Sequence, residues 1–162
     1  MTPEPINYLR TVIDITSHER SLTVDQVWQK LVDWQGQSDW MLATKVWSDP
    51  NESSEGLGTK IYAFTGPRAG KYSTRSMWRF LGILDEMVVS IWQSPNFCEV
   101  QHVGKVIKGS GEFRLEAISG GVRFHWLEII DAPKPILFLI RPGILFGVKL
   151  SLRRFRKACV AA

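Results

Sequence analysis

Strand-like stretches separated by turn residues fill the chain from residue 59 to residue 130, and a long amphipathic stretch follows them. Each alternates polar and apolar residues over a few positions, as half-buried strands do. Ser119-Gly120-Gly121 between the last two stretches is a tight hairpin signal. Because hairpins join antiparallel strands, this order predicts an antiparallel sheet and the α+β class. We expect strands at 11–19, near 45–48, and at 59–65, 72–85, 87–93, 97–106, 110–118 and 122–130.

Apolar residues at helical spacing predict three helices. Val24 to Val32 forms one short helix behind the capping hydroxyls of Ser21 and Thr23, and a second short helix covers 38–41. The last helix is long, and Pro142 either lies in its first turn or kinks a helix that begins near Ile136. Its apolar stripe faces the sheet and consists of Ile144, Leu145, Val148, Leu152, Phe155 and Cys159.

Length and composition fit one compact domain. The 162 residues suffice for one core, so we expect a single domain over 1–162 with residues 1–8 flexible. With 44% hydrophobic and 22% charged residues, disorder is not expected. No secretory signal is visible, which predicts a cytoplasmic protein. The apolar stretch 135–150 is too short and too interrupted to span a membrane. Cys98 and Cys159 are interpreted as buried structural thiols.

The formal net charge of +4 is local. Five cations and no acid lie in the last fourteen residues, and without them 15 basic residues face 16 acidic ones. We therefore expect no nucleic-acid partner. The patch is either a solvated helix face or a weak contact with anionic membranes. It consists of Lys149, Arg153, Arg154, Arg156 and Lys157. The oligomeric state is not predicted.

Three segments carry a resemblance to a known superfamily. Residues 22–28 (LTVDQVW) resemble the "A-P-x-E-x-V-W" entry into helix one of the START-like (SRPBCC) superfamily, with Leu22-Thr23 in place of Ala-Pro. Asp39-Trp40-Met41 resembles its "W-P-x-W" second helix. Residues 111–116 and 120–126 are similar to its "G-x-x-x-L-x-x…G-G-T-R-V-x-W" hairpin.

The resemblance implies a helix-grip fold, in which a curved antiparallel sheet of about six or seven strands wraps a long C-terminal helix, with two short helices after the first strand. It covers the chain from Thr11 onward. The superfamily includes the polyketide cyclase/dehydrase and lipid-transport group and the Bet v 1-type proteins. Its members include lipid carriers, hormone receptors, polyketide aromatase/cyclases and ring-hydroxylase subunits. The fold implies an internal apolar cavity, which we expect to hold roughly 300–1,000 Å³.

Two polar residues on expected strands are the candidate catalytic groups. Glu128 shares its face with Phe124 and Trp126, which matches the apolar inward positions of the superfamily and places a carboxylate inside. His102 shares a face with Cys98 and Val100. Glu128 could contact a polar ligand group or act as a general acid or base, and alternatively lie wet at the cavity mouth. His102 could transfer protons, and alternatively be a satisfied or exposed histidine.

The expected ligand-binding residues line the cavity or its mouth. The tryptophans among them could equally be plain core, and Arg141 either contacts an acidic group at the entrance or extends to solvent. Dispersed histidines predict no metal, and no motif indicates a cofactor. The set comprises Trp40, Trp78, Trp92, His102, Phe113, Phe124, Trp126, Glu128, Arg141, Leu145 and Val148.

Three functions compete at this stage. The first is a carrier or sensor of a lipid, polyketide or other aromatic or apolar molecule. The second is a polyketide aromatase/cyclase or dehydratase that uses polar groups of the cavity as general acid and base. The third is an interaction module that docks on membranes or acidic proteins through the basic helix.

Overall fold

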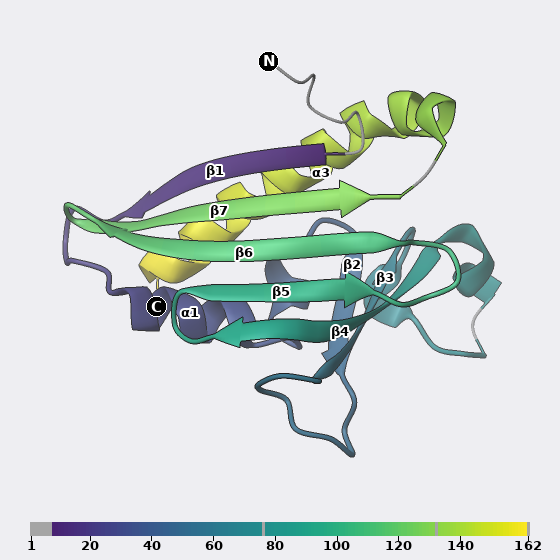
Figure 1. Cartoon of the computed structure of the whole chain (residues 1–162), viewed down its shortest axis with the longest axis horizontal. Helices are drawn as coiled ribbons and strands as arrows, with labels where there is room; N and C mark the ends of the chain where they lie inside the picture. Colours follow the sequence, from purple (N-terminus) through teal and green to yellow (C-terminus); the bar gives the residue numbers. More distant parts are fainter. Residues whose placement is uncertain (1–7, 76, 132, 162) are drawn as a thin grey trace.

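One antiparallel sheet of seven strands forms the frame of the protein (Figure 1). The computed structural model describes residues 8–75, 77–131 and 133–161. The strand order is β1-β7-β6-β5-β4-β3-β2. The strands are β1 (Tyr8–Thr16), β2 (Thr44–Ser48), β3 (Lys60–Thr65), β4 (Ile83–Gln93), β5 (Phe97–His102), β6 (Gly109–Ile118) and β7 (Gly121–Ile130).

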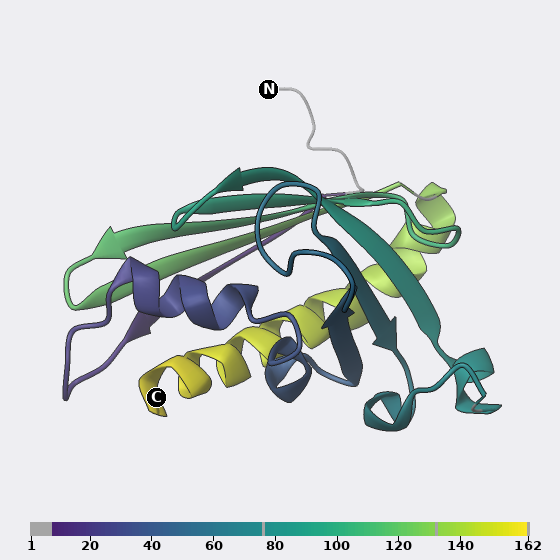
Figure 2. The same cartoon turned by 90° about the horizontal axis from the view of Figure 1, so that it is seen from below.

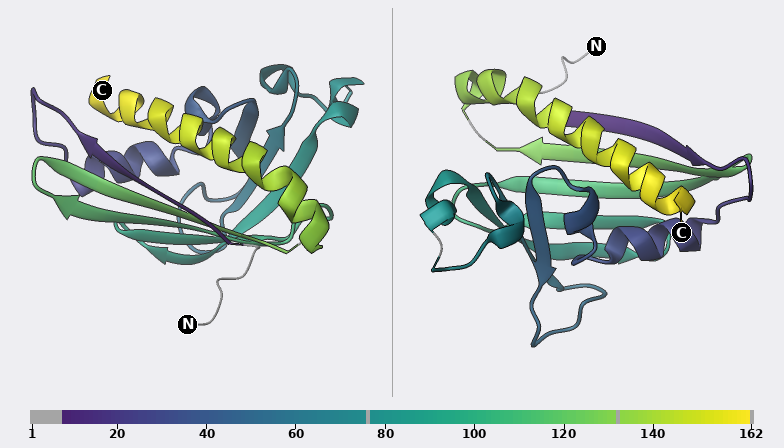
Figure 3. Two further views of the ribbon diagram at one scale, coloured as in Figure 1. Left: turned by 90° about the horizontal axis from the view of Figure 1, so that it is seen from above. Right: turned by 180° about the vertical axis from the view of Figure 1, so that it is seen from behind.

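The predicted helix-grip architecture is confirmed. The sheet curves, and the long helix α3 (Lys134–Ala161) lies obliquely across its concave side (Figures 2 and 3). Helix α1 (Val24–Val32) lies beside the C-terminal half of α3, and the one-turn helix α2 (Gln37–Trp40) follows it. No helix in the part of the chain described here combines the length and apolarity needed to cross a membrane.

Helix α1 begins and ends at the predicted residues because its first turn is capped. Thr23 Oγ1 accepts from the Gln26 amide at 3.3 Å, and Gln26 Oε1 accepts from the Thr23 amide at 3.1 Å. This reciprocal capping box satisfies two donors that a helix start otherwise leaves unpaired. The helix buries Val27, Trp28 and Leu31 against the core.

Aromatic side chains fill the middle of the fold. The Phe155 ring of α3 lies 4.7 Å from Trp40 of α2 and 5.5 Å from Phe124 of β7, centroid to centroid. Trp126 contacts Phe113 edge-on at 5.3 Å. These rings are buried. Such contacts stabilise beyond the area that they bury, so this region is a packed core.

The two halves of α3 differ in burial. Ser151, Leu152, Phe155 and Cys159 in the C-terminal half are buried. Among the described side chains from Lys134 to Leu150, none is buried, and Ile144, Leu145 and Val148 are only partly covered. Pro142 lies inside the helix, where its ring lacks an amide donor. The sheet therefore grips the second half of α3 and leaves the first half largely open.

The predicted strand at 72–85 is wrong. Two 3-10 helices occupy this region, η1 (Ala69–Lys71) and η2 (Met77–Leu81), and β4 begins only at Ile83. Gly66 and Gly82 pack backbone to backbone, and a Cβ on Gly82 would lie 2.5 Å from the Thr65 carbonyl oxygen. Gly66 and Gly82 thus lie opposite each other one step beyond Thr65 and Ile83, where the antiparallel pairing of β3 and β4 begins. β4 then runs on through Glu86, where two separate strands were predicted.

Other strand ends shift by a few residues. β1 spans 8–16 rather than 11–19, and β5 ends at His102 rather than Val106. Of the predicted flexible segment 1–8, residues 1–7 lie outside the described residues, and Tyr8 already belongs to β1. The register between β4 and β5 shifts between Val89 and Ile91.

Candidate functional site

A polar cluster of Asp85, His102 and Glu128 lies on the concave side of the sheet. His102 Nδ1 lies 2.7 Å from Asp85 Oδ2, and His102 Nε2 lies 3.3 Å from Glu128 Oε2. The three side chains are 11%, 6% and 16% exposed, in the order Asp85, His102 and Glu128. Three buried ionisable groups in a face of otherwise apolar residues are costly, so they are the first candidates for function.

Strand register explains how residues from three strands meet. Glu128 follows Phe124 and Trp126 on the inward face of β7, as predicted. His102 shares its face of β5 with Cys98 and Val100, as predicted, and the structure shows that this face points inward. Asp85 lies on β4, which pairs with β5. The structure thus brings together both candidate catalytic residues and adds Asp85, which the sequence interpretation had not singled out.

A glycine leaves room for His102 and Glu128 to meet across an intervening strand. β6 lies between β5 and β7, and at this level it carries Gly109 opposite His102 and Gly111 opposite Glu128. A Cβ at Gly111 would lie 3.0 Å from Glu128 Oε1. Side chains of strands that are not neighbours can therefore touch above β6, and Gly111 was a sequence signal for this contact.

The surroundings of His102 keep its imidazole protonated. Burial by itself lowers the pKa, but the hydrogen bonds to Asp85 and Glu128 outweigh burial and raise the pKa of His102 to about 10 from the ordinary 6.5. The ring is therefore an imidazolium near neutral pH, with one N–H directed at each carboxyl group.

Two buried polar atoms near this region lack a hydrogen-bond partner. They are Asp85 Oδ1, an acceptor, and Trp40 Nε1, a donor. The neighbouring Trp126 is satisfied, because its Nε1 donates to Glu128 Oε1 at 2.6 Å. Trp40 packs edge-on against Trp126 at 6.3 Å between ring centroids. Unpaired buried polar atoms are rare and unfavourable, so each calls for a function or an occupant.

The other predicted binding residues divide into three groups. Trp40, Phe113, Phe124 and Trp126 belong to the packed core described above. Leu145 and Val148 lie half-buried on the open half of α3. The third group, which consists of Trp78, Trp92 and Arg141, lies away from the polar cluster.

Trp78 belongs to η2 rather than to a sheet face, and Arg68 lies over its ring at 4.4 Å. Trp92 does not share a face with Val88 and Ser90 as predicted, because the irregular register at Ser90 turns it inward. It meets Trp28 of α1 edge-on at 5.1 Å. Arg141 is exposed to solvent, which agrees with its extension from the helix.

Two hollows of substantial size are open grooves at the surface. One of about 470 Å³ lies between α1 and the end of α3, and one of about 590 Å³ lies beside β1. Neither is lined by the predicted binding residues. The first is lined by Arg20, Leu22, Asp25, Gln26, Val27, Gln29, Lys30 and Cys159, and the second by Val12, Ile13, Asp14, Arg123, His125 and Arg156.

The expected enclosed cavity is not one of these grooves. Where the sequence places it, the ring of Phe155 occupies the space between α2 and β7. No group of three His, Cys, Asp or Glu side chains within the described residues could hold a metal ion. In the polar cluster, both ring nitrogens of His102 are already directed at carboxyl groups.

Comparison with known proteins extends only to the fold. No family model matches the chain, and no curated protein matches it. Solved structures do. Protein Ms6760 from Mycobacterium smegmatis has a TM-score of 0.67 at 11% identity, covering 96% of this chain and 92% of that one. A protein from Arthrobacter aurescens has a TM-score of 0.69 at 10% identity, covering 97% and 88%.

The Aha1 dimer from Colwellia psychrerythraea has a TM-score of 0.64 at 10% identity and covers 94% of this chain and 96% of that one. The likeness to these solved structures is therefore a match of fold over almost the whole chain. At such identity the likeness carries no residue role and no ligand from one chain to the other.

Proposed function

We propose that this protein binds a small apolar molecule that carries a polar head group, as a carrier or sensor. The head group contacts the polar cluster, and the apolar part lies under the open half of α3. The helix-grip fold supports this, since it is typical of ligand-binding proteins. The observation that carries the proposal is the polar cluster itself, buried on the concave face with Asp85 Oδ1 unpaired.

The charge of the cluster favours one chemistry of head group. Its free acceptor is a carboxylate oxygen, and the cluster has two carboxyl groups for one imidazolium. A hydroxyl or a protonated amine can donate to Asp85 Oδ1, whereas a carboxylate would be repelled. A long-chain or polycyclic alcohol or amine is therefore the proposed ligand class.

The apolar part of the ligand needs space that the packed core does not supply. Leu145 and Val148 on the first half of α3 and Met87 on β4 are only partly covered. Because Pro142 interrupts the hydrogen bonding of the helix, the first half can move outward while Phe155 holds the second half in place. The ligand then takes up the space between this half of α3 and the strands.

A binding experiment with three matched probes tests the proposal. Pyrene-labelled long-chain alcohol, amine and carboxylate of equal length are titrated into the protein, and native mass spectrometry checks protein from its own host for a bound apolar species. We expect saturable binding of the alcohol or amine, with affinity about tenfold above that of the carboxylate. Absence of both a co-purifying species and saturable probe binding overturns the proposal.

Two variants locate the site. Asp85→Asn removes the free carboxylate and is expected to weaken binding of the amine about tenfold, whereas Asp14→Asn on β1 changes an exposed carboxylate and leaves binding unchanged. Val148→Trp fills the space under α3 and weakens all three probes. Equal effects of the two Asp variants would contradict binding at the polar cluster.

A second candidate function is an enzyme of the aromatase/cyclase or dehydratase type. The contact of His102 with Glu128 favours it, because a protonated imidazole beside a carboxylate is an acid and base pair. A β-hydroxyacyl thioester probe serves as the test: loss of water gives the α,β-unsaturated (enoyl) thioester, whose formation is followed by absorbance. Formation of the enoyl thioester that is lost in His102→Gln supports the enzyme, and no turnover in the wild type excludes dehydration of this class.

Other expectations stay predictions. A cytoplasmic location, a single domain over 1–162 and the absence of a nucleic-acid partner follow from the sequence alone. The weak contact of Lys149, Arg153, Arg154, Arg156 and Lys157 with anionic membranes is a separate proposal.

A further inference from the structure

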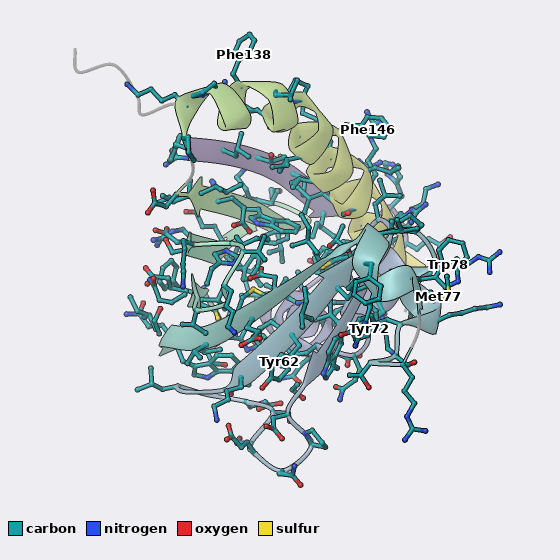
Figure 4. All side chains as sticks on the ribbon, turned by 90° about the vertical axis from the view of Figure 1, so that its right-hand side faces the viewer. Tyr62, Tyr72, Met77, Trp78, Phe138 and Phe146 are labelled. Atoms are coloured by element: carbon teal, nitrogen blue, oxygen red, sulfur yellow. The ribbon has the colours of Figure 1, made fainter. Side chains whose placement is uncertain are left out.

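Large apolar side chains are exposed on two elements at one end of the molecule. Figures 2 and 3 both show the first half of α3 and the 3-10 helix η2 at this end. Figure 4 looks at this end and labels Phe138, Phe146, Met77 and Trp78. The exposed side chains are Phe138 (80%), Leu139 (80%) and Phe146 (64%) on α3, and Met77 (83%), Phe80 (73%) and Leu81 (61%) on η2. We call them the apolar rim.

The two segments that carry the apolar rim are also rich in positive charge. Residues 56–84 and 132–162, which include η2 and α3, hold 12 of the 20 basic residues and none of the 16 acidic ones. The rest of the chain has 8 basic residues against 16 acidic ones. Arg75 and Arg79 accompany Met77 and Phe80, and Arg141 lies between Phe138 and Phe146 in the sequence. Both elements of the rim therefore carry cations beside their exposed apolar side chains.

Helical geometry aligns the two properties along α3. At 3.6 residues per turn, Phe146, Lys149 and Arg153 follow one another at steps of three and four and share one face. All three are exposed. The same stripe therefore begins with aromatic side chains and continues with cations toward the C-terminus. The basic patch predicted from the sequence is the cationic end of this stripe.

We propose that this face docks on the surface of an anionic lipid membrane. The side chains of the apolar rim lie at the boundary between head groups and acyl chains, and the cations of α3 and η2 contact lipid phosphates. Interfacial binding requires bulky apolar residues beside cations, because the free energy of burying apolar area and the electrostatic attraction to anionic lipids add. An acidic protein would use the cations but give the exposed rings no acyl layer to enter.

Two elements together make the contact stable. Each bears three exposed apolar side chains, and one such set gives only weak, reversible association. Because both belong to one folded unit, the second set binds at high effective concentration once the first is in place. Variants in either element should therefore reduce binding strongly. The inference does not depend on the ligand or the polar cluster.

Vesicle flotation tests the proposal with the whole chain. Vesicles of pure phosphatidylcholine are compared with vesicles that contain three parts in ten of phosphatidylglycerol, at low and at high NaCl. We expect binding to the anionic vesicles only, falling at least about tenfold between 50 and 500 mM NaCl. Binding that is equal on both vesicle types, or absent from anionic vesicles at low salt, overturns the proposal.

Matched variants separate the rings from the charges. Phe138→Ser with Phe146→Ser, Phe80→Ser, and Lys149→Glu with Arg153→Glu are each expected to lower vesicle binding at least about tenfold. Leu57→Ser, which alters an equally exposed residue of the β2–β3 loop, and Arg114→Glu on β6 are the controls and leave binding unchanged.

The identity of the partner is decided by competition. If soluble polyglutamate displaces the protein from vesicles and the serine variants still float, the partner is an acidic polypeptide and the proposal is wrong. Vesicle flotation and probe titration are carried out on the same wild-type protein, which keeps failure of the ligand proposal distinct from failure of this one.

Discussion

The carboxylate of Glu128 on β7 lies against Gly111 on β6. A Cβ at residue 111 would come within 3.0 Å of Glu128 Oε1 and 3.3 Å of Oε2. A Cβ at this position would require the carboxylate to shift by a few tenths of an ångström, and the same carboxylate lies 3.3 Å from His102 Nε2. The glycine therefore bears on how closely His102 and Glu128 approach each other.

For Gly111→Ala we expect the His102 imidazole to titrate at lower pH, because Glu128 moves off and one of its two carboxyl partners is weakened. NMR titration of the His102 ring protons measures this. Gly143→Ala in α3 meets nothing within 4 Å, so it serves as a control that leaves the titration unchanged. An unaltered His102 titration in Gly111→Ala would contradict the role assigned to the glycine.

Stability should fall with rising pH because of His102. Its pKa is raised from 6.5 to about 10 in the folded chain, so the folded state holds the proton more tightly than the unfolded state. This contribution is fully present below the unfolded pKa and is lost as pH rises through the folded value. Between pH 7 and 9 we expect a slope approaching about 1.4 kcal/mol per pH unit.

The measurement is urea unfolding at a series of pH values in the wild type and in His102→Gln. The variant is less stable at pH 7, and its stability changes less between pH 7 and 9. The range stops at pH 9 because the Cys98 and Cys159 thiols ordinarily titrate there. Parallel pH profiles for the two proteins would show that the cluster does not hold a shifted proton.

Loss of one carboxylate from the polar cluster should cost more than loss of a surface carboxylate. In Asp85→Asn the buried imidazolium keeps only Glu128, and breaking a buried pair costs about 3 kcal/mol. Asp14 forms an exposed ion pair with Arg123 at 2.7 Å, so Asp14→Asn is expected to change stability little. Chemical denaturation of both variants compares them, and equal losses would contradict the burial argument.

Truncation of Phe155 should open the core. Its ring separates Trp40 from Phe124, so Phe155→Ala is expected to lower the free energy of unfolding by about 3–5 kcal/mol. The space that it leaves is lined by aromatic side chains, and small aromatic solutes should then raise the melting temperature of the variant and not that of the wild type. Thermal unfolding with and without indole measures both effects.

The two thiols should be inert in the native protein. Burial raises the pKa of Cys98 and of Cys159 to about 12, so neither is a thiolate near neutral pH. An aromatic disulfide reagent should modify both thiols only after denaturation. Rapid release of chromophore at pH 8 from folded protein would contradict their placement in the core.

Much of the fold could be predicted because local signals agreed with tertiary packing. Thr23 and Gln26 mark the start of α1, and the turns between the later strands fix an antiparallel order. Alternation placed Phe124, Trp126 and Glu128 on one face of β7, and the resemblance implied that this face points inward, which led to Glu128. Periodicity and turn residues are properties of adjacent positions, and a single sequence displays them directly.

The segment before β4 could not be predicted by the same means. Trp78 and Phe80 stand two positions apart, as residues on one face of a strand do, yet η2 lies outside the sheet and exposes Phe80. Gly66 and Gly82 pack against each other just before β4, and this contact joins positions that no local pattern links. Asp85 was missed for the same reason, because its place in the polar cluster depends on its contact with His102 of the neighbouring strand.

The packing of the Phe155 ring is the other feature that could not be predicted from the sequence. Its place in the apolar stripe of α3 was predicted, but the stripe does not show how far each side chain reaches. The ring packs against Trp40 and Phe124, two residues that the sequence interpretation had assigned to the lining of a cavity. Side-chain packing of this kind depends on three-dimensional complementarity, which periodicity does not encode.

The pairing of β1 with β7 has a consequence for folding during synthesis. Asp14 and Arg123, which face each other in this pairing, are 109 positions apart in sequence. During synthesis β1 cannot pair until β7 has left the ribosome, more than a hundred residues later, so the apolar face of β1 stays uncovered until then. Contacts of such long range slow folding. The nascent chain is therefore expected to need shelter from aggregation for most of its time on the ribosome.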